Sequence, residues 1–248
     1  MKIVEIDAVN FKNNESRITK EKVVKDATIT LTINNTFSRS LSAIEDSLKE
    51  FAVGYLFNEN LVKALDDIKE IDIDGCEINI EIDDTLLRKN ETLLCSDSAG
   101  GLRSKINEIT PVESDFQVDV HELIERIEEL KDNAEIWQAT GGTHVAGIVY
   151  KDNFIVKEDV SRHVAVDKVI GYGILHNFDL NHSYVIYSGR MPADMVIKMT
   201  RAGVPILASN AAPANSGYNI AKKGNITLVG FLRGQRCNIY NNQNRILF

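Results

Sequence analysis

Residues 158–168 carry the densest set of groups able to do chemistry in this sequence. The stretch reads EDVSRHVAVDK and holds Glu158, Asp159, Arg162, His163, Asp167 and Lys168. The valines between them have partial helical spacing, which predicts a loop that leads into a helix. Buried charge is costly unless it is paired, so the cluster predicts either a structural network of ion pairs or a binding site for a charged ligand.

Three further segments place glycine and polar residues at the ends of apolar strands. Residues 140–144 read TGGTH, residues 188–190 read SGR, and residues 227–234 read TLVGFLRG. Glycine permits a positive φ or a close approach of the backbone to a ligand, and arginine offers a rigid fork of donors that suits phosphate oxygens. One such loop is ordinary architecture. Several in one domain predict a shared crevice at strand ends, where open α/β sheets bind ligands.

Charge is unevenly distributed along the chain, whose formal net charge is -8. Between positions 66 and 84 nine acidic residues face Lys69 alone, whereas from position 185 onward eight basic residues face Asp194 alone. An acidic total argues against non-specific binding of nucleic acid, while a locally basic region suits a compact polyanion. Two solvated faces of opposite sign are the alternative. The pattern favours a small phosphate-bearing molecule over a nucleic acid.

The elements that must position these groups follow from hydrophobic periodicity. Before position 111 we expect a strand over 27–35, a helix over 42–62 with Ser42 as its N-cap and Glu45 completing a capping box, and strands over 68–74 and 76–82. After it we expect a helix over 121–131, a hairpin over 145–156, helices over 162–175, 193–202 and 216–222, and strands over 184–187, 205–208 and 227–231. This order predicts a three-layer α/β domain with a largely parallel sheet over 112–248, after a smaller α+β domain over 1–111.

Composition limits the setting in which the protein works. A chain of 248 residues with 44% hydrophobic residues can bury a substantial core. No apolar run reaches the length needed to span a bilayer, and no signal pattern opens the chain, so we expect a soluble cytoplasmic protein. Cys76, Cys95 and Cys237 are odd in number and scattered. They predict reduced thiols rather than disulfides, and they lack the spacing of a structural zinc site.

Taken together, four motifs resemble those of the formate dehydrogenase accessory sulfurtransferase family, the FdhD type. They are TGG-x-H, an EDVGRHNAVDK-like segment, SGR before a helix, and GF-x-RG near the end, and they occur here in the same order over 141–144, 158–168, 188–190 and 230–234. The resemblance implies a cytidine-deaminase-like fold for the C-terminal domain. It also implies a sulfur carrier that takes sulfur from a cysteine desulfurase to the molybdenum or tungsten bis-guanine-dinucleotide cofactor, before that cofactor enters the formate dehydrogenase apoenzyme.

Two departures from the family pattern concern the reactive loop and the charged segment. The family's C-x-x-C is Cys95-Ser96-Asp97-Ser98 here, so the first thiol is kept and the second is replaced by Ser98. Ser161 and Val164 replace the family's glycine and asparagine. A single carrier thiolate still suffices for one sulfur atom.

Cys95 is accordingly the expected persulfide carrier. Small, polar and glycine residues follow it over 96–101, which predicts a mobile, exposed loop, as a reactive thiolate requires. The neighbouring Asp97 disfavours the thiolate, and Arg103 or the basic domain would offset it. An ordinary loop cysteine is the alternative interpretation.

The turn after the last predicted strand is the expected site for the guanine-dinucleotide end of the cofactor. Its backbone would emerge at the ligand-binding edge of the sheet, its glycine permits close approach, and its arginines neutralise phosphate charge. A basic turn that merely covers the sheet is the alternative. The residues are Phe231, Leu232, Arg233, Gly234, Gln235 and Arg236.

Two rival functions remain to be weighed. A zinc deaminase needs H-x-E and P-C-x-x-C, but His144-Val145-Ala146 lacks the glutamate and no cysteine pair follows Pro192 or Pro213. A non-enzymatic chaperone that binds and delivers the cofactor, with Cys95 incidental, is the stronger rival. We expect no nucleic-acid partner and no membrane partner, and a homodimer as the commonest soluble assembly.

Overall fold

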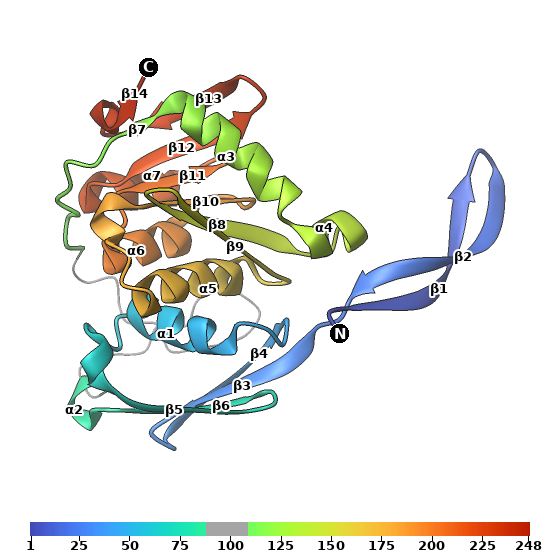
Figure 1. The fold of residues 1–248 in the computed structure, drawn as a ribbon, viewed down its shortest axis with the longest axis horizontal. Coiled ribbons are helices and arrows are strands. Elements are labelled where there is room, and N and C mark those ends of the chain that lie inside the picture. The colour runs from blue at the N-terminus through green and yellow to red at the C-terminus, as the bar shows by residue number, and fades with distance from the viewer. Residues whose placement is uncertain (88–108) are drawn as a thin grey trace.

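The structure is a computed structural model that describes residues 1–87 and 109–248. Two β-sheets lie on either side of a helical layer, a further helix covers the outer face of the larger sheet, and a long hairpin projects from the side (Figure 1). None of the described helices is both long and apolar enough to cross a bilayer.

The smaller sheet is built from the N-terminal half of the chain in the order β4-β3-β6-β5. Its strands are β3 (Ala27–Ile33), β4 (Phe37–Ala43), β5 (Ile68–Asp74) and β6 (Glu77–Ile82). Alternate residues of β3 and β6 are fully buried, as expected for strands with one face against a core. That core is completed by helix α1 (Leu48–Asn58), and the predicted strands over 27–35, 68–74 and 76–82 are confirmed.

The predicted start of the first helix is wrong. Ser42 lies in β4 opposite Thr28 of β3, and its hydroxyl donates to Asp26 instead of capping a helix. Helix α1 begins only at Leu48, after Ser47 in the left-handed region with φ 52°. Strand pairing of β4 through Ala43 overrides the local capping signal, because a paired strand offers several backbone hydrogen bonds where a cap offers one or two.

Helix α1 is buried on nearly every side, because it lies between the smaller sheet and helix α5 (Arg162–Leu175). Two glycines allow the backbones of α1 and α5 to touch. A Cβ on Gly54 would lie 1.9 Å from the carbonyl oxygen of Asp167, and one on Gly171 would lie 1.8 Å from that of Glu50. The two halves of the chain therefore share one interior. The predicted boundary near residue 111 stays a prediction.

The larger sheet has six strands in the order β13-β12-β11-β10-β8-β9. They are β8 (His144–Tyr150), β9 (Asn153–Asp159), β10 (Tyr184–Tyr187), β11 (Ile206–Ser209), β12 (Thr227–Arg233) and β13 (Arg236–Tyr240). Helices α5, α6 (Ala193–Ala202) and α7 (Asn215–Gly224) cover one face, and α3 (Val120–Asp132) covers the other. Because both faces of the sheet are covered by helices, successive side chains of β10 pack against opposite layers. Val185 and Tyr187 pack toward α5–α7, whereas Tyr184 and Ile186 pack toward α3.

The three-layer α/β architecture is thus confirmed, but the sheet is mixed rather than largely parallel. Only β10, β11 and β12 run parallel, while β8, β9 and β13 join antiparallel. The reason is connection length, since β8–β9 and β12–β13 are linked by tight turns and such turns can join only antiparallel strands. Short elements complete the fold: α2 (Asp84–Leu87), β7 (Val118–Asp119), α4 (Glu135–Thr140) and β14 (Ile246–Leu247).

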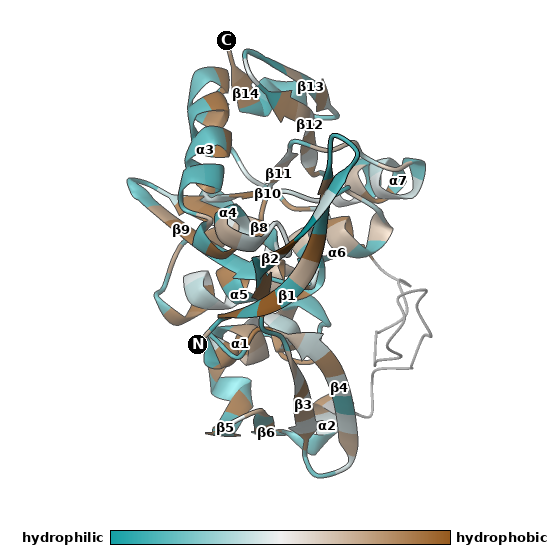
Figure 2. Ribbon diagram, turned by 90° about the vertical axis from the view of Figure 1, so that its right-hand side faces the viewer, coloured by the Kyte–Doolittle hydropathy of each residue, from teal (hydrophilic) through white to brown (hydrophobic). Residues whose placement is uncertain are grey.

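The projecting hairpin was not expected from the sequence. It consists of β1 (Ile3–Lys12) and β2 (Glu15–Val24), paired only with each other (Figures 1 and 2). Asn13 and Asn14 form its turn with φ 54° and 63°. Positive φ at both central residues is the geometry that matches the twist of a two-residue hairpin. We refer to residues 3–24 as the arm.

Candidate functional site

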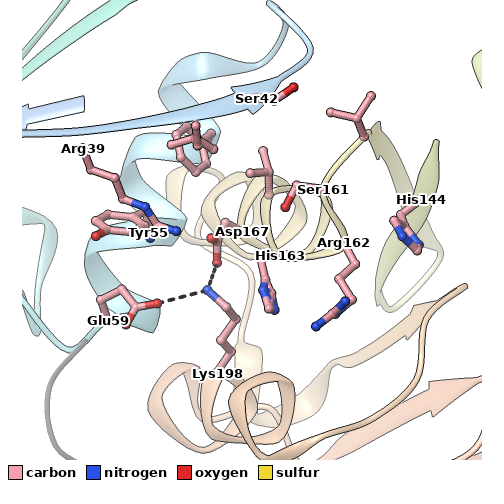
Figure 3. Close-up of a pocket in the computed structure, with 14 residues that line it drawn as sticks. Arg39, Ser42, Tyr55, Glu59, His144, Ser161, Arg162, His163, Asp167 and Lys198 are labelled. Atoms are coloured by element: carbon pink, nitrogen blue, oxygen red, sulfur yellow. Dashed lines mark hydrogen bonds and ion pairs between the residues drawn. The ribbon is translucent and has the colours of Figure 1, made fainter. Parts of the chain in front are cut away.

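A polar cavity of about 500 Å³ lies at the junction of the two halves of the chain (Figure 3). Strand β4 and helix α1 contribute one wall, and β8, the start of α5 and α6 contribute the others. Its volume is in the range of small-molecule binding sites. Its polar and charged lining residues are Arg39, Ser42, Tyr55, Glu59, His144, Ser161, Arg162, His163, Asp167 and Lys198.

The charged segment 158–168 divides between a structural network and this cavity. Asp159 and Lys168 form a fully buried ion pair with Nζ–Oδ2 2.8 Å. Lys168 also donates to the carbonyl of Ile44 at 3.2 Å, and the Ile44 N–H donates to Asp159 at 3.0 Å. Burial raises the pKa of the Asp159 carboxyl, and the Lys168 charge opposes that rise. These contacts tie Ile44, the residue after β4, to the end of β9 and to α5, so this part of the segment is structural.

Glu158 is also structural. Its carboxylate accepts from the backbone N–H groups of Ile136 and Trp137 at 2.9 and 2.7 Å, at the start of α4. It accepts from the Thr143 hydroxyl at 2.9 Å as well. A carboxylate at a helix N-terminus satisfies free N–H groups and complements the helix dipole. Glu158 therefore fixes the loop that carries the predicted TGG-x-H motif.

Ser161, Arg162 and His163 face the cavity from the first turn of α5 (Figure 3). His163 Nε2 lies 3.0 Å from Asp194 Oδ2, and an Arg162 guanidinium nitrogen lies 3.8 Å from the same oxygen. The Arg162 Nε has no hydrogen-bond partner among the described residues. The positive end of the α5 dipole adds to these groups, so this wall of the cavity favours an anion.

The floor of the cavity is a buried network around Lys198. Its Nζ lies 2.7 Å from Asp167 Oδ1 and 3.4 Å from Glu59 Oε1, and Asn58 donates to the same Asp167 oxygen at 2.6 Å. The lysine side chain is only 2% exposed. Arg201 approaches Glu59 at 3.6 Å. Lys198 is therefore held by protein carboxylates, whereas the Nε of Arg162 keeps a free donor among the described residues.

Sequence reasoning missed five of these lining residues: Arg39, Ser42, Tyr55, Glu59 and Lys198. The Arg39 guanidinium lies 5.7 Å from the centre of the Tyr55 ring, and burial raises the pKa of the Tyr55 hydroxyl. One signal was available, because Glu59 follows Tyr55 by four residues and so shares its helix face. Arg39 gave no signal, because β4 itself was not predicted.

His144 stands at the first residue of β8 and borders two spaces. One is the cavity, and the other is a second space of about 250 Å³ that is lined by Ile127, Leu130, Trp137 and Val145 among others. We call the second space the hollow. Burial lowers the pKa of His144, and the positive charge of Arg162 lowers it further. The imidazole is consequently neutral at neutral pH and is suited to accept or share a hydrogen bond.

The predicted strand-end turns lie along one edge of the larger sheet, and of their residues only His144 lines the cavity. Strands β10, β11 and β12 are parallel, so residues 188–190 after β10 and the end of β12 with its turn into β13 lie at the same edge. The antiparallel β8 begins at that edge with His144. The Ser188 N–H donates to the Val145 carbonyl at 2.9 Å, and the Ser188 hydroxyl accepts from the Val145 N–H at 3.0 Å. This hydrogen-bonded pair fixes the SGR turn against β8.

The predicted dinucleotide turn, residues 231–236, lies further along this edge. Arg233, Gly234, Gln235 and Arg236 are exposed at the β12–β13 connection, with Gly234 at φ 56°. Phe231 is a bulge at φ 53° whose N–H donates to the Ala211 carbonyl at 3.0 Å. The Leu232 side chain is fully buried in the core under α3, which leaves only its backbone available to a ligand. None of these residues lines the cavity.

Several of the C-terminal basic residues are structural rather than free to bind a polyanion. Arg245 is only 3% exposed and donates to the carbonyls of Val112 and Pro205 at 3.1 and 3.3 Å. Arg201 donates to the carbonyl of Asn58 at 2.8 Å. The basic excess of this half therefore overstates the charge available to a ligand.

Of the three cysteines, two fall within the described residues. Cys76 and Cys237 are half-buried, and burial raises the pKa of the Cys237 thiol, which disfavours its thiolate. Cys95, together with Asp97, Ser98 and Arg103, lies outside the described residues.

Comparison with known proteins identifies the family. The model of the FdhD/NarQ family matches residues 24–247. The sulfur carrier protein FdhD of Methanothermobacter thermautotrophicus is 45% identical over 98% of both chains, and the protein FdhD of Methanocaldococcus jannaschii is 32% identical over 89% of this chain and 88% of that one. A crystal structure from Desulfotalea psychrophila, described as a candidate formate dehydrogenase accessory protein, superposes over 100% of both chains with a TM-score of 0.83 and 26% identity. This chain belongs to the FdhD/NarQ family.

Proposed function

We propose that this protein is a sulfur carrier in the maturation of formate dehydrogenase. The observation that supports this most strongly is the match, along almost the whole chain, to relatives named sulfur carrier protein FdhD. The conclusion rests on family membership, and the chemistry proposed below rests on residues of this chain.

Cys95 is the proposed carrier. Its thiolate would attack the terminal sulfur of a persulfide on a cysteine desulfurase, so that the donor's S–S bond breaks and the donor cysteine leaves as a thiolate. Cys95 would then hold the sulfane sulfur as a persulfide. Transfer to the acceptor would break this new S–S bond, and the electron pair of that bond would leave with Cys95 as its thiolate. The first step exchanges one thiolate for another and needs no oxidant. In the second step the sulfur leaves at the sulfane level, and the reduced metal centre of the acceptor would supply the two electrons that convert it to a sulfide ligand.

The acceptor in this proposal is the molybdenum or tungsten bis-guanine-dinucleotide cofactor, bound as a substrate. Two features of the chain suit a molecule with several phosphates. The α5 wall of the cavity presents Arg162 and His163 together with the positive end of the helix dipole. The exposed arginines of the β12–β13 turn, Arg233 and Arg236, lie at the same edge of the sheet. We assign the guanine-dinucleotide end to that turn and the remainder of the cofactor to the cavity.

Mass spectrometry after incubation with a cysteine desulfurase and cysteine tests the carrier role directly. We expect wild-type protein to gain one sulfur atom on Cys95, and Cys95→Ser to gain none there and to fail to restore formate dehydrogenase activity in a strain lacking its own accessory protein. Ser98→Ala is the matched control in the same segment and should behave as wild type. Full activity of Cys95→Ser would refute the carrier and leave the cofactor chaperone as the better account.

A further inference from the structure

Asp194 is a charged residue beside the candidate site to which the proposed function gives no role. It is the one acidic residue in the sequence after position 185. It lies in the first turn of α6 and is not among the residues that line the cavity. It is nevertheless within ion-pair distance of two residues that do line it, Arg162 and His163. This position indicates a role that acts through those two neighbours.

The two carboxylate oxygens of Asp194 have different partners. Oδ1 accepts a hydrogen bond from the backbone N–H of Met195 at 3.0 Å, at the start of α6. A carboxylate there is stabilised by the helix dipole, so the backbone of α6 fixes its place. Oδ2 lies 3.0 Å from His163 Nε2 and 3.8 Å from a guanidinium nitrogen of Arg162. One carboxylate therefore links α6 to both side chains of the α5 wall.

The SGR turn supports Arg162 from a second direction. A Cβ added to Gly189 would lie 3.6 Å from the Arg162 Cδ and 2.7 Å from the ring of Tyr187. The absence of a side chain at Gly189 thus leaves the room that the Arg162 side chain uses. The carbonyl of Gly189 is fixed by the fully buried Ser209, whose hydroxyl donates to it at 2.6 Å. Arg162 is therefore packed against a fixed turn while its guanidinium group approaches Asp194.

The orientation of Arg162 matters because its side chain reaches into the cavity (Figure 3). Its Nε is buried and has no hydrogen-bond partner among the described residues, so this donor remains for a ligand. A long side chain without fixed contacts samples many rotamers and must be ordered when an anion binds, which lowers the affinity. A carboxylate that holds the guanidinium group in place removes this loss before the ligand arrives.

We propose that Asp194 is a positioning residue that orients Arg162 and His163 toward an anionic group of the ligand in the cavity. The inference rests on the proposed function, which places part of the cofactor there. The alternative is that Asp194 only stabilises the start of α6. Asparagine would then replace it without effect, because its side-chain oxygen can still accept from the Met195 N–H.

Proton–nitrogen NMR of the arginine Nε–H groups tests the orientation without any ligand. The signal of Arg162, assigned by its loss in Arg162→Lys, should lie apart from those of exposed arginines and exchange slowly with water. In Asp194→Asn it should move to the position of exposed arginines, and its exchange should become about tenfold faster or more. Asp194→Glu keeps the carboxylate and should largely retain the wild-type signal.

The matched control is Asp179→Asn, which makes the same chemical change at another helix start. Asp179 caps the 3₁₀ helix η2 (Leu180–His182) and lies 2.8 Å from His182, and neither residue lines the cavity. This variant loses a carboxylate–histidine contact at the surface. It should leave the Arg162 signal and formate dehydrogenase maturation as in the wild type.

Maturation of formate dehydrogenase in a strain lacking its own accessory protein gives the functional measurement. Asp194→Asn should still gain one sulfur atom on Cys95 but restore about 10- to 100-fold less activity, and Asp194→Glu should recover most of it. Removal of a negative charge beside a site for an anion should by itself strengthen binding, so a loss reports lost orientation.

An unchanged Arg162 signal in Asp194→Asn, or full activity of that variant, overturns the inference. Failure of the proposed function gives a different result, because Cys95 would then gain no sulfur even in the wild type. In that case the Arg162 signal alone decides whether Asp194 orients the α5 wall.

Discussion

Replacing Gly171 with alanine should destabilise the protein strongly, although the change adds one methyl group and favours a helix. Gly171 lies within α5, where alanine is intrinsically better by about 1 kcal/mol. The new Cβ would lie 1.8 Å from the carbonyl oxygen of Glu50 and 2.7 Å from the backbone nitrogen of Gly54. Both atoms belong to the backbone of α1, so no side-chain rotation relieves the clash and the two helices must separate.

The size of the effect follows from these two opposing contributions. Overpacking costs about 1–3 kcal/mol in general, and a backbone-to-backbone clash is at the upper end or above it. After the gain in helix propensity, the net loss should be about 2 kcal/mol or more. For a chain of this size that corresponds to a fall in melting temperature of about 4–8 °C.

Gly173→Ala is the matched control, since it lies in the same helix and has the same change in propensity. Its Cβ would lie 3.1 Å from the ends of the Ile148 and Leu180 side chains, which can move, and at an ordinary 3.6 Å from the Phe178 Cβ. Thermal unfolding followed by circular dichroism should therefore leave Gly173→Ala within about 1 kcal/mol of wild type. Equal melting temperatures for the Gly171 and Gly173 variants would refute the close crossing of α1 and α5.

Three other predictions follow from the site. Lys198→Met leaves Asp167 and Glu59 buried without their lysine and should cost about 3–5 kcal/mol in urea unfolding, whereas Met at the exposed Lys223 should cost little. The pKa of His144 in the folded protein is below its ordinary 6.5, so just below pH 6.5 the unfolded chain binds more protons than the folded chain. The free energy of unfolding should therefore fall as the pH drops below 6.5, and His144→Gln should lose this part of the acid sensitivity. The double variant Arg233→Ala and Arg236→Ala should weaken GDP binding by on the order of 2–4 kcal/mol in calorimetry. The control double variant Lys222→Ala and Lys223→Ala should bind GDP as the wild type does. Unchanged GDP affinity in the arginine variant would move the nucleotide site toward Arg162 and Arg190.

The elements of the larger sheet were predictable because short apolar runs are bounded by glycine, proline and polar residues that mark where they end. The helix over 162–175 coincides with α5, and the strand over 184–187 coincides with β10. The EDVSRHVAVDK segment was interpreted as either a structural network or a ligand site, and it contains a buried ion pair and also lines the cavity. Asp159 and Lys168 belong to the first, while Arg162 and His163 belong to the cavity.

What the sequence could not supply depends on contacts distant along the chain. Ser42 had every local feature of an N-cap, but pairing with Thr28 placed it in a strand. Glu59 reaches the cavity because α1 packs on α5 and α6, and Arg39 reaches it because β4 pairs with β3. No local pattern encodes either arrangement. The arm was not predicted because its strands carry polar and apolar residues on both faces and so lack the alternation of a half-buried strand. None of its residues is fully buried within the chain.

The position of α1 between the smaller sheet and α5 also governs when this protein can fold during its synthesis. The carboxylate that Ile44 contacts lies 115 residues downstream, on Asp159. At the usual 5–20 residues per second, roughly 6–23 s elapse between the emergence of the two partners from the ribosome. Throughout that interval the nascent N-terminal half exposes the apolar side of α1 that α5 later covers, so slow translation of the intervening segment should favour aggregation or chaperone capture.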